Sequence, residues 1–287
     1  MISVIIPAYN EADSIAGVVD ALRAVMEPTG LSYEVIVVDD GSTDGTAASL
    51  VGKEVTIMTH PENKGYGASL KTGIRGAGGD TIVITDADGT YPVSEIPGLV
   101  RAMDEEGYDM VVGARTGKDV NIPLVRRPAK WILKKLADYL SETKIPDLNS
   151  GLRAFRKDLA FKYFHLLPSG FSFTTTITLA LLSDGYNVKF TPIDYLSRAG
   201  GKSKIRPRDF TNFMLLIVRV ICYFNPLKVF LPVSLVFIGW GSIHIVETML
   251  REHRVTEAGL LAVLLGFQMA FMGLITDVMV RRDRWVK

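Results

Sequence analysis

Short apolar runs alternate with amphipathic stretches over residues 1–115. The runs are rich in β-branched residues and cover residues 3–7, 34–39, 55–59, 81–85 and 110–113. Between the first two, residues 15–26 repeat apolar side chains at the spacing of one helical face. Nearly continuous hydrophobic strands separated by helices are typical of a parallel sheet that is buried on both sides. The pattern therefore predicts an α/β fold built on a mostly parallel, Rossmann-like sheet flanked by helices.

The strongest apolar pattern lies at the C-terminus. Residues 229–250 and 258–280 are two long apolar runs joined by a short polar loop. At a rise of about 1.5 Å per residue, each run can cross a hydrocarbon core about 30 Å thick. The alternative, two buried helices of a soluble protein, would need a much larger core around them. We therefore predict a transmembrane hairpin over residues 227–287.

Basic residues flank the hairpin on the side where both of its ends emerge. They are Arg206, Arg208, Arg219, Lys228, Arg281, Arg282, Arg284 and Lys287. The positive-inside rule makes this side cytosolic, although the connecting loop also carries Arg251 and Arg254. The apolar strand pattern begins at Ile2 with no signal peptide before it. We therefore expect residues 1–205 on the cytosolic face, at the plasma membrane of a prokaryote or the endoplasmic reticulum of a eukaryote.

Composition excludes several classes of function. The chain has 32 Lys and Arg against 31 Asp and Glu, which gives a formal net charge of +1. This balance argues against a dedicated nucleic-acid binder, which would be basic overall. The single cysteine, Cys222, excludes an internal disulfide framework and a zinc site made of several cysteines.

Polar residues follow three of the predicted strands. The segments are Pro7-Ala8-Tyr9-Asn10-Glu11, Asp39-Asp40-Gly41-Ser42-Thr43-Asp44 and Asp86-Ala87-Asp88-Gly89. Ligands of such sheets bind beyond the carboxyl ends of the strands, where these segments meet. Clustered carboxylates repel one another unless a positive group compensates them. Ser42 and Thr43 also allow a second interpretation, as caps of a following helix.

The spacing of Asp86 and Asp88 indicates a divalent cation. Residues two apart in extended backbone point to the same side. Mg²⁺ and Mn²⁺ prefer oxygen ligands, often carboxylates together with substrate phosphates. Since no His or Cys lies beside this pair, zinc is disfavoured.

Residues 63–70 are glycine-rich and open a predicted helix. The segment lacks the third glycine of the dinucleotide fingerprint, because that position is Leu70, and it follows the third strand. The chain also has no Walker lysine pattern. We therefore reject hydride transfer and ATP hydrolysis, and expect a tight turn here rather than a phosphate cradle.

Six motifs, taken together and in their order along the chain, resemble those of the family 2 glycosyltransferases. Besides the three strand-end segments, they are Asn63-Lys64-Gly65-Tyr66-Gly67, Val112-Gly113-Ala114-Arg115 and Asn149-Ser150-Gly151-Leu152-Arg153. The resemblance is strongest to the polyprenyl-phosphate sugar synthases, and it implies the GT-A fold over residues 1–205. Within this domain, residues 1–115 would form the nucleotide-sugar half and residues 116–205 the acceptor half.

The resemblance also implies roles for individual residues. Asp86 and Asp88 would bind Mg²⁺ or Mn²⁺ and, with Arg115 and Asp147, form the catalytic group. The nucleotide sugar would contact Pro7, Tyr9, Asn10, Glu11, Asp39, Asp40, Ser42, Lys64, Gly65, Ala87, Ser150, Gly151 and Arg153. Related mannose synthases carry Gln as a further metal ligand where this chain has Thr90. This departure favours a UDP-sugar over GDP-mannose as the donor.

The implied reaction transfers a sugar, with inversion, from the nucleotide to a polyprenyl phosphate. A phosphate oxygen is already anionic near neutral pH, so no general base is required. A hydroxyl acceptor, such as a lipid-linked glycan or a glycerolipid, would need one. Asp147 could serve as that base, or it could orient Arg153 or cap a turn. A silent scaffold that only binds nucleotide sugar is disfavoured by the intact pair Asp86 and Asp88.

Two basic clusters suit the acceptor phosphate. We assign Arg115, Arg126, Arg127, Arg198, Lys202 and Lys204 to it, because arginine binds phosphate through a bidentate fork. Attraction to anionic lipid headgroups is the other interpretation of these residues. Within the juxtamembrane segment, residues 206–226, apolar side chains recur on one helical face, which suits a helix lying in the bilayer interface. Contact with a second copy, giving a homo-oligomer, is the alternative for this helix.

Overall fold

The computed structural model of the chain describes residues 1–115, 138–139, 144–170, 172–195, 215, 222–223 and 225–285. The chain divides into two compact units, Met1–Phe213 and Met214–Lys287. The expected juxtamembrane helix, residues 206–226, falls mostly outside the described residues, which include Leu215, Cys222, Tyr223, Asn225 and Pro226 of it.

A seven-stranded sheet forms the centre of the first unit, in the part of the chain that the structure describes. Its spatial order is β3-β2-β1-β4-β6-β5-β7. The strands are β1 (Ile2–Ala8), β2 (Tyr33–Asp39), β3 (Thr56–Thr59), β4 (Thr81–Ile84), β5 (Met110–Arg115), β6 (Arg153–Arg156) and β7 (Val188–Ile193). Neighbouring strands are parallel, except that β6 is antiparallel to both β4 and β5. The predicted mostly parallel α/β fold is confirmed.

The reversed direction of β6 matters for the site. Arg153, the first residue of β6, pairs with Ile84 at the end of β4 and with Val112 in β5. The residues that precede β6 therefore lie at the same edge of the sheet as the carboxyl ends of the parallel strands. This brings residues 147–152 to the ends of β4 and β5.

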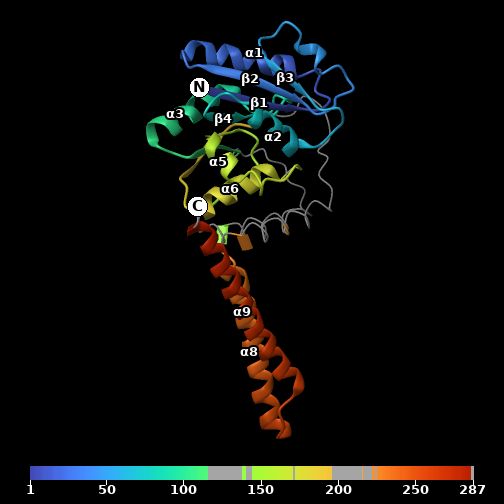
Figure 1. The fold of residues 1–287 in the computed structure, drawn as a ribbon, viewed down its shortest axis with the longest axis vertical. Coiled ribbons are helices and arrows are strands. Elements are labelled where there is room, and N and C mark those ends of the chain that lie inside the picture. The colour runs from blue at the N-terminus through green and yellow to red at the C-terminus, as the bar shows by residue number, and fades with distance from the viewer. Residues whose placement is uncertain are drawn as a thin grey trace. The chain divides into compact units, whose positions relative to one another are not determined.

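Helices cover both faces of the sheet. They are α1 (Ile15–Met26), α2 (Tyr66–Gly76), α3 (Ile96–Glu106), α5 (Lys157–Lys162) and α6 (Phe173–Ser183), with short 3₁₀ turns η1 (Glu27–Thr29), η2 (Ala48–Leu50) and η3 (Val93–Glu95). Figure 1 shows α1 and α2 on opposite sides of β1 and β2. The apolar faces of α1 and α3 join one core with alternate residues of the strands, such as Val4 and Val83.

On the other face, α2 approaches β1 closely. A Cβ built on Gly73 of α2 would lie 2.5 Å from Cγ2 of Ile5. Only a residue without a side chain fits at this distance, so Gly73 allows the helix to pack directly on the strand. The packing holds α2 directly against β1.

The second unit contains a helical hairpin. Its helices are α8 (Leu227–Glu252) and α9 (Glu257–Trp285), which run side by side (Figure 1). Glycines allow this contact, since a Cβ on Gly241 would lie 2.8 Å from the carbonyl oxygen of Gly259, and one on Gly266 would lie 2.5 Å from Cγ1 of Ile238. The Ser234 hydroxyl donates a hydrogen bond of 2.7 Å to the carbonyl oxygen of Gly266. Small residues and buried hydroxyl groups of this kind are typical of helix contacts in membranes.

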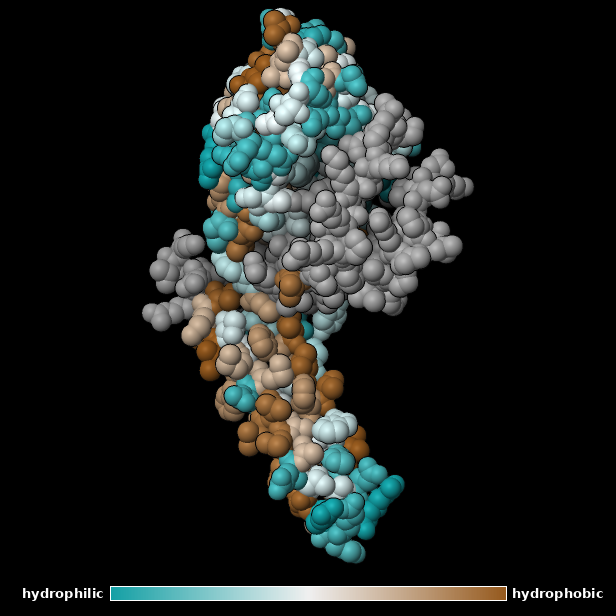
Figure 2. Space-filling model, turned by 90° about the vertical axis from the view of Figure 1, so that its right-hand side faces the viewer, coloured by the Kyte–Doolittle hydropathy of each residue, from teal (hydrophilic) through white to brown (hydrophobic). Residues whose placement is uncertain are grey.

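The outer surface of the hairpin is apolar. Figure 2 shows hydrophobic residues over most of its length and polar residues at its tip. Large exposed side chains include Leu235, Trp240, Leu264 and Phe271. Among the described residues, α8 and α9 are the two helices long and apolar enough to cross a membrane. A core helix of a soluble protein would bury such side chains, whereas a lipid bilayer would solvate them.

Candidate active site

The loops after β1 and β2 are joined by reciprocal hydrogen bonds. The backbone N–H of Asn10 donates to the Ser42 hydroxyl at 2.9 Å, and the N–H of Thr43 donates to the side-chain oxygen of Asn10, also at 2.9 Å. Asn10 has a φ of 57°, in the left-handed region that asparagine tolerates better than most residues. Ser42 therefore binds the neighbouring loop. Its alternative role as a helix cap is wrong, because the described connection from β2 to β3 contains only the 3₁₀ turn Ala48–Leu50.

Asp39, the last residue of β2, and Asp40, which follows it, have different surroundings. Asp39 is 4% exposed, and its carboxylate accepts a hydrogen bond of 2.9 Å from the N–H of Ser42. The Asp40 carboxylate lies 2.6 Å from Nδ1 of His60 and accepts hydrogen bonds from the N–H groups of Lys64 (2.9 Å) and Gly65 (2.8 Å). Burial acts to raise the pKa of Asp40, but these hydrogen bonds outweigh it and lower the pKa overall. Asp40 thus stays ionised and fixes the glycine-rich segment.

The glycine-rich segment makes a tight turn into α2. Gly65 has a φ of 98°, and a Cβ on Gly67 would lie 2.3 Å from the carbonyl oxygen of Pro168. The N–H of Ala68 donates to the carbonyl oxygen of Ser169 at 2.8 Å. The N–H groups of Lys64, Gly65 and Ala68 are therefore bound by the protein itself, as in a tight turn.

Asp86 and Asp88 follow β4 at the same rim. Oδ1 of Asp86 accepts a hydrogen bond of 3.1 Å from the Tyr66 hydroxyl. Oδ1 of Asp88 accepts two from Thr90, at 2.6 Å from the hydroxyl and 3.1 Å from the backbone N–H. A Cβ on Gly151 would lie 2.7 Å from Oδ1 of Asp86, so only glycine leaves room for this carboxylate.

The donor set of this pair fits a shared divalent cation. The described residues contain no cluster of three or more His, Cys, Asp or Glu side chains that could hold a metal. Mg²⁺ is commonly bound by one or two carboxylates, with substrate phosphates and waters completing the octahedron. Two carboxylates at an open rim suit that arrangement, and they do not suit a closed structural site.

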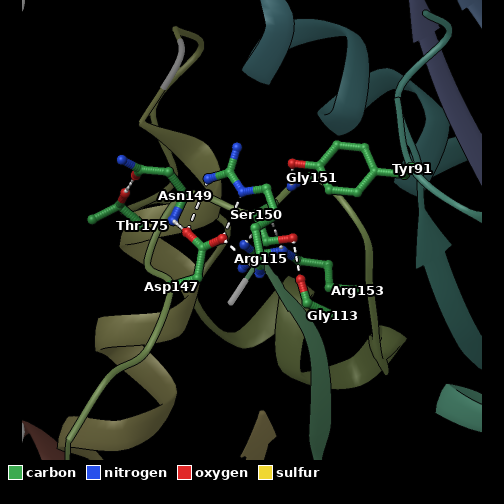
Figure 3. A network of polar contacts seen from close by, with 9 residues as sticks. All are labelled: Tyr91, Gly113, Arg115, Asp147, Asn149, Ser150, Gly151, Arg153 and Thr175. Carbon is green, nitrogen blue, oxygen red and sulfur yellow. Dashed lines mark hydrogen bonds and ion pairs between the residues drawn. The ribbon is translucent and has the colours of Figure 1, made fainter. Parts of the chain in front are cut away.

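A second polar network joins β5 to the segment before β6 (Figure 3). Arg115 forms a bidentate ion pair with Asp147, with Nε–Oδ2 and Nη2–Oδ1 distances of 2.6 and 2.9 Å. Asp147 also accepts a hydrogen bond from the N–H of Asn149 at 3.1 Å, so it caps a turn. Burial tends to raise the pKa of Asp147, but the hydrogen bonds and charge of Arg115 outweigh it and lower the pKa overall. Oδ1 of Asn149 accepts in turn from the Thr175 hydroxyl of α6 at 2.6 Å.

Aromatic rings complete the surroundings of Arg115. Its guanidinium carbon lies 6.0 Å from the centre of the Tyr91 ring and 5.3 Å from that of Tyr195. The two rings pack edge to face with their centres 5.3 Å apart. Cation–π contacts of this kind orient a guanidinium without neutralising its charge. Arg115 is therefore held by one carboxylate and two rings.

Arg153 and its neighbours support this network from below the surface. Arg153 is fully buried and donates to the carbonyl oxygens of Ser150 and Thr174 and to the Thr178 hydroxyl. Burial lowers the pKa of Arg153 to about 10, so the side chain remains protonated at neutral pH. Buried Ser150 donates to the carbonyl oxygen of Gly113, and the N–H of Gly151 donates to the Tyr91 hydroxyl at 2.7 Å. These hydrogen bonds of Arg153 and Ser150 are thus made with other residues of the chain, and nucleotide-sugar binding by these two residues stays a prediction.

Most of the described residues that the sequence predicts for the site lie at the same edge of the sheet. Tyr9 is 38% exposed at the rim, whereas Ala87 is buried and Pro7 is a buried residue of β1. Glu11 donates its backbone N–H to the Thr46 hydroxyl at 2.9 Å. The acceptor-phosphate candidates that lie outside the described residues are Arg126, Arg127, Arg198, Lys202 and Lys204.

Sequence reasoning missed four residues of this site: His60, Tyr66, Tyr91 and Tyr195. His60 and Tyr195 come directly or almost directly after strands β3 and β7. The rule that selected the aspartates, scrutiny of the residues after each strand, would also have selected these two. Tyr66 lies inside the glycine-rich motif at residues 63–67, but its contact with Asp86 depends on how α2 packs, which no local pattern reveals.

Comparison with known proteins shows the family of this chain. Residues 3–164, more than half of the chain, match the family described as glycosyl transferase family 2. The chain belongs to glycosyl transferase family 2. This family 2 glycosyltransferase also matches the GtrB C-terminal hairpin over residues 225–281, which include α8 and most of α9.

Individual relatives agree with the fold and the class. The glycosyltransferase is 26% identical over 286 residues to the low-salt glycan biosynthesis hexosyltransferase Agl6 of Haloferax volcanii, covering 96% of this chain and 68% of that protein. The structure of this chain is similar to that of glucosyl-3-phosphoglycerate synthase from Mycobacterium tuberculosis in complex with Mn²⁺, uridine diphosphate and phosphoglyceric acid. That likeness has a TM-score of 0.61 and 21% identity, and covers 77% of this chain and 78% of the other.

A second solved structure gives the same result. Mannosyl-3-phosphoglycerate synthase from Rubrobacter xylanophilus has a TM-score of 0.61 at 18% identity, with 77% of this chain and 73% of the other covered. The mixed sheet of the glycosyltransferase, with one antiparallel strand among parallel ones, is thus the GT-A fold.

Proposed function

We propose that this glycosyltransferase moves a hexose from a nucleotide diphosphate sugar to a polyprenyl phosphate, dolichyl or undecaprenyl, at the cytosolic face of a membrane. One observation carries the proposal: a family 2 domain and a GtrB-type hairpin occur in the same chain. A polyprenyl chain cannot leave the bilayer cheaply, because each exposed CH₂ costs about 0.8 kcal/mol. An enzyme with such an acceptor must therefore work at the membrane surface, and an apolar hairpin would keep it there.

The donor site lies at the ends of β1, β2 and β4. Asp39, Tyr9 and Glu11 would receive the nucleoside, and the hydrogen bonds of Asn10 and Ser42 that join the two loops support this role. A UDP-sugar is the favoured donor over GDP-mannose. The relative from Mycobacterium tuberculosis was solved with uridine diphosphate and Mn²⁺, which supports this choice.

Asp86 and Asp88 would hold Mg²⁺ or Mn²⁺ between the protein and the diphosphate. The cation, when bound, neutralises negative charge that grows on the leaving diphosphate. The protein contributes two carboxylates, which accept hydrogen bonds from Tyr66 and Thr90 and have space beside Gly151.

The state of Asp147 favours a phosphate as the nucleophile. An effective general base has a pKa near the working pH and a free path to the proton that it removes. Asp147 has a lowered pKa, and both of its oxygens bind the Arg115 side chain. A phosphate oxygen needs no base: it attacks the anomeric carbon, the bond from that carbon to the diphosphate breaks, and the nucleoside diphosphate leaves with the electron pair. Arg115, which Asp147 and the two tyrosine rings hold at the rim, would bind the acceptor phosphate.

A nucleotide screen of the full chain in detergent tests the donor and metal parts of this proposal. Thermal unfolding is followed with UDP- and GDP-sugars, each with and without Mn²⁺. A ligand at a hundredfold excess over its dissociation constant should stabilise the protein by about 2.7 kcal/mol. We expect stabilisation by a UDP-sugar that depends on Mn²⁺ in the wild type and is absent in Asp88→Asn. Equal stabilisation of both proteins would contradict the metal role of Asp88.

A further inference from the structure

We propose that Tyr66 and Thr90 are positioning residues, whose hydroxyl groups hold the carboxylates of Asp86 and Asp88 in the orientation that binds the cation. The inference deepens the proposed function and rests on its metal site. It assigns to two neutral side chains the task of shaping a site that has few protein ligands.

Tyr66 reaches Asp86 from a different element of the fold. It is the first residue of α2, and its hydroxyl lies 3.1 Å from Oδ1 of Asp86, which follows β4. A phenol keeps its proton at neutral pH and a carboxylate offers only acceptors, so Tyr66 donates this bond. The bond therefore links the start of α2 to the rim.

The start of α2 is itself rigidly placed. A Cβ built on Gly65 would lie 2.9 Å from the carbonyl oxygen of Ser169, and one on Gly67 would lie 2.3 Å from that of Pro168. Both distances are too short for a real Cβ, so only glycine fits at these two positions. Gly73 packs directly on Ile5 of β1. The Tyr66 hydroxyl is thus presented from a fixed backbone, as a positioning group requires.

Gly151 limits Asp86 from another direction. A Cβ at Gly151 would lie 2.7 to 2.9 Å from the three carboxylate atoms of Asp86. The N–H of Gly151 donates to the Tyr91 hydroxyl at 2.7 Å, which holds this backbone in place. The Asp86 carboxylate therefore has Tyr66 as a donor and the Gly151 backbone as a wall.

Thr90 has the same function for Asp88. It is fully buried, and its hydroxyl and backbone N–H both donate to Oδ1 of Asp88, at 2.6 and 3.1 Å. Two donors on one oxygen fix the rotation of the carboxylate. Thr90 therefore directs both of its donors toward the neighbouring aspartate.

Such support has a measurable consequence. A site with two carboxylate ligands depends strongly on their orientation, and loss of an outer partner of a metal ligand typically costs about 10- to 100-fold in metal affinity or activity. Removing one hydroxyl should therefore weaken binding that involves the cation. Binding of the nucleoside part alone should not change.

Calorimetric titration of the full chain in detergent separates these two quantities. UDP, and GDP in a parallel series, is titrated with and without Mn²⁺ into the wild type, Tyr66→Phe, Thr90→Val and Thr90→Ser. Tyr163→Phe is the matched control, because buried Tyr163 also donates its hydroxyl to an aspartate, Asp184, at the end of α6. We expect Tyr66→Phe and Thr90→Val to lose about tenfold or more of the Mn²⁺-dependent affinity, with unchanged affinity in the absence of metal. Thr90→Ser and Tyr163→Phe should retain the wild-type values.

The outcomes distinguish this inference from the proposed function. If the wild type binds nucleotide more tightly with Mn²⁺ and both hydroxyl-deleted variants do the same, the positioning roles are refuted while the metal site stands. A loss of affinity that is equal with and without Mn²⁺ would also refute them, because it indicates general damage to the fold. If the wild type ignores Mn²⁺ entirely, the metal site and this inference both fail.

Discussion

At the scale of single residues, carboxylates at the rim are held by fixed donors. Hydrogen bonds are present at Asp39, Asp40, Asp86, Asp88 and Asp147. Several of these donors are backbone N–H groups, which cost no side-chain entropy to order. The result is a preorganised acidic edge that need not rearrange when charge develops. Asp147 differs from the others, because its partner is a guanidinium.

Asp147→Asn should destabilise the protein by about 2 to 3 kcal/mol. Breaking a buried ion pair leaves an unpaired charge and usually costs about 3 to 5 kcal/mol, and the cost here falls below that range because the Arg115 side chain is 23% exposed. The pKa of Asp147 is lowered in the folded state, so the pair stabilises the protein above the unfolded pKa of about 3.9 and is lost as the pH falls through the folded value. Denaturant unfolding at pH 7 should therefore show a difference between variant and wild type that persists at pH 5 and shrinks below pH 4. A difference that vanishes already at pH 6 would contradict the ion pair.

Thr85 tests what a buried hydroxyl without a hydrogen-bond partner costs in stability. It is fully buried, and its hydroxyl is the one buried side-chain polar atom without a hydrogen-bond partner in the described part of the chain. Replacing an unsatisfied hydroxyl by a methyl group is neutral or stabilising, so Thr85→Val should raise the free energy of unfolding by up to about 1 kcal/mol. Thr90→Val, at an equally buried threonine with a bonded hydroxyl, should lower it. Chemical denaturation of the two variants compares them directly, and a loss of stability in Thr85→Val would show that its hydroxyl has a partner.

At the scale of elements, the strand ends and the start of α2 define the site. Apolar patterning predicts β1 to β5 and α1 closely, because the strands are short, nearly continuous apolar runs and the buried residues of α1 recur every three to four positions. The same patterning misses β6, whose sequence Arg-Ala-Phe-Arg has a charged residue at each end. Arg153 can lie in a buried strand only because α6 and the segment before β6 supply oxygens to its guanidinium, and the contacts with α6 are distant in sequence. For the same reason the sequence cannot separate Asp39 from Asp40, whereas the contacts of Asp40 with His60, Lys64 and Gly65 do.

A pair of glycine substitutions tests how tightly α2 is held. Gly67→Ala places a Cβ within 2.3 Å of the Pro168 oxygen, so the helix or the facing loop must move, and we expect a loss of several kcal/mol in the free energy of unfolding. Gly98→Ala, in the first turn of α3 with no atom within 4 Å of its Cβ, should instead stabilise the protein by about 0.5 to 1 kcal/mol. Thermal unfolding measures both. Equal effects of the two substitutions would contradict the close packing at Gly67.

At the scale of the whole molecule, a polar catalytic unit and an apolar hairpin belong to one chain. The hairpin is a pair of closely packed helices whose exposed side chains are large and hydrophobic. Both of its ends emerge on one side, flanked by basic residues, whereas the loop at residues 253–256 lies at the other end. The positive-inside rule therefore predicts that the loop faces away from the cytosol.

Cysteine labelling in intact cells tests this orientation. In a Cys222→Ser background, Val255→Cys introduces a thiol into the loop, and Val51→Cys introduces one at a position of the catalytic unit that is 81% exposed. We expect a membrane-impermeant maleimide to label Val255→Cys in intact cells or sealed right-side-out vesicles, and Val51→Cys only after permeabilisation. The reverse pattern would place the catalytic unit on the opposite side of the membrane from the one proposed.

The identity of the acceptor is tested most directly by offering the full chain, in detergent with Mn²⁺ and a labelled nucleotide sugar, either a polyprenyl phosphate or the same polyprenol without its phosphate. We expect label to enter the organic phase only with the phosphate, and mild acid to release it, because a sugar phosphodiester is acid-labile. Transfer to the unphosphorylated alcohol, giving a product that resists mild acid, would contradict a phosphate nucleophile.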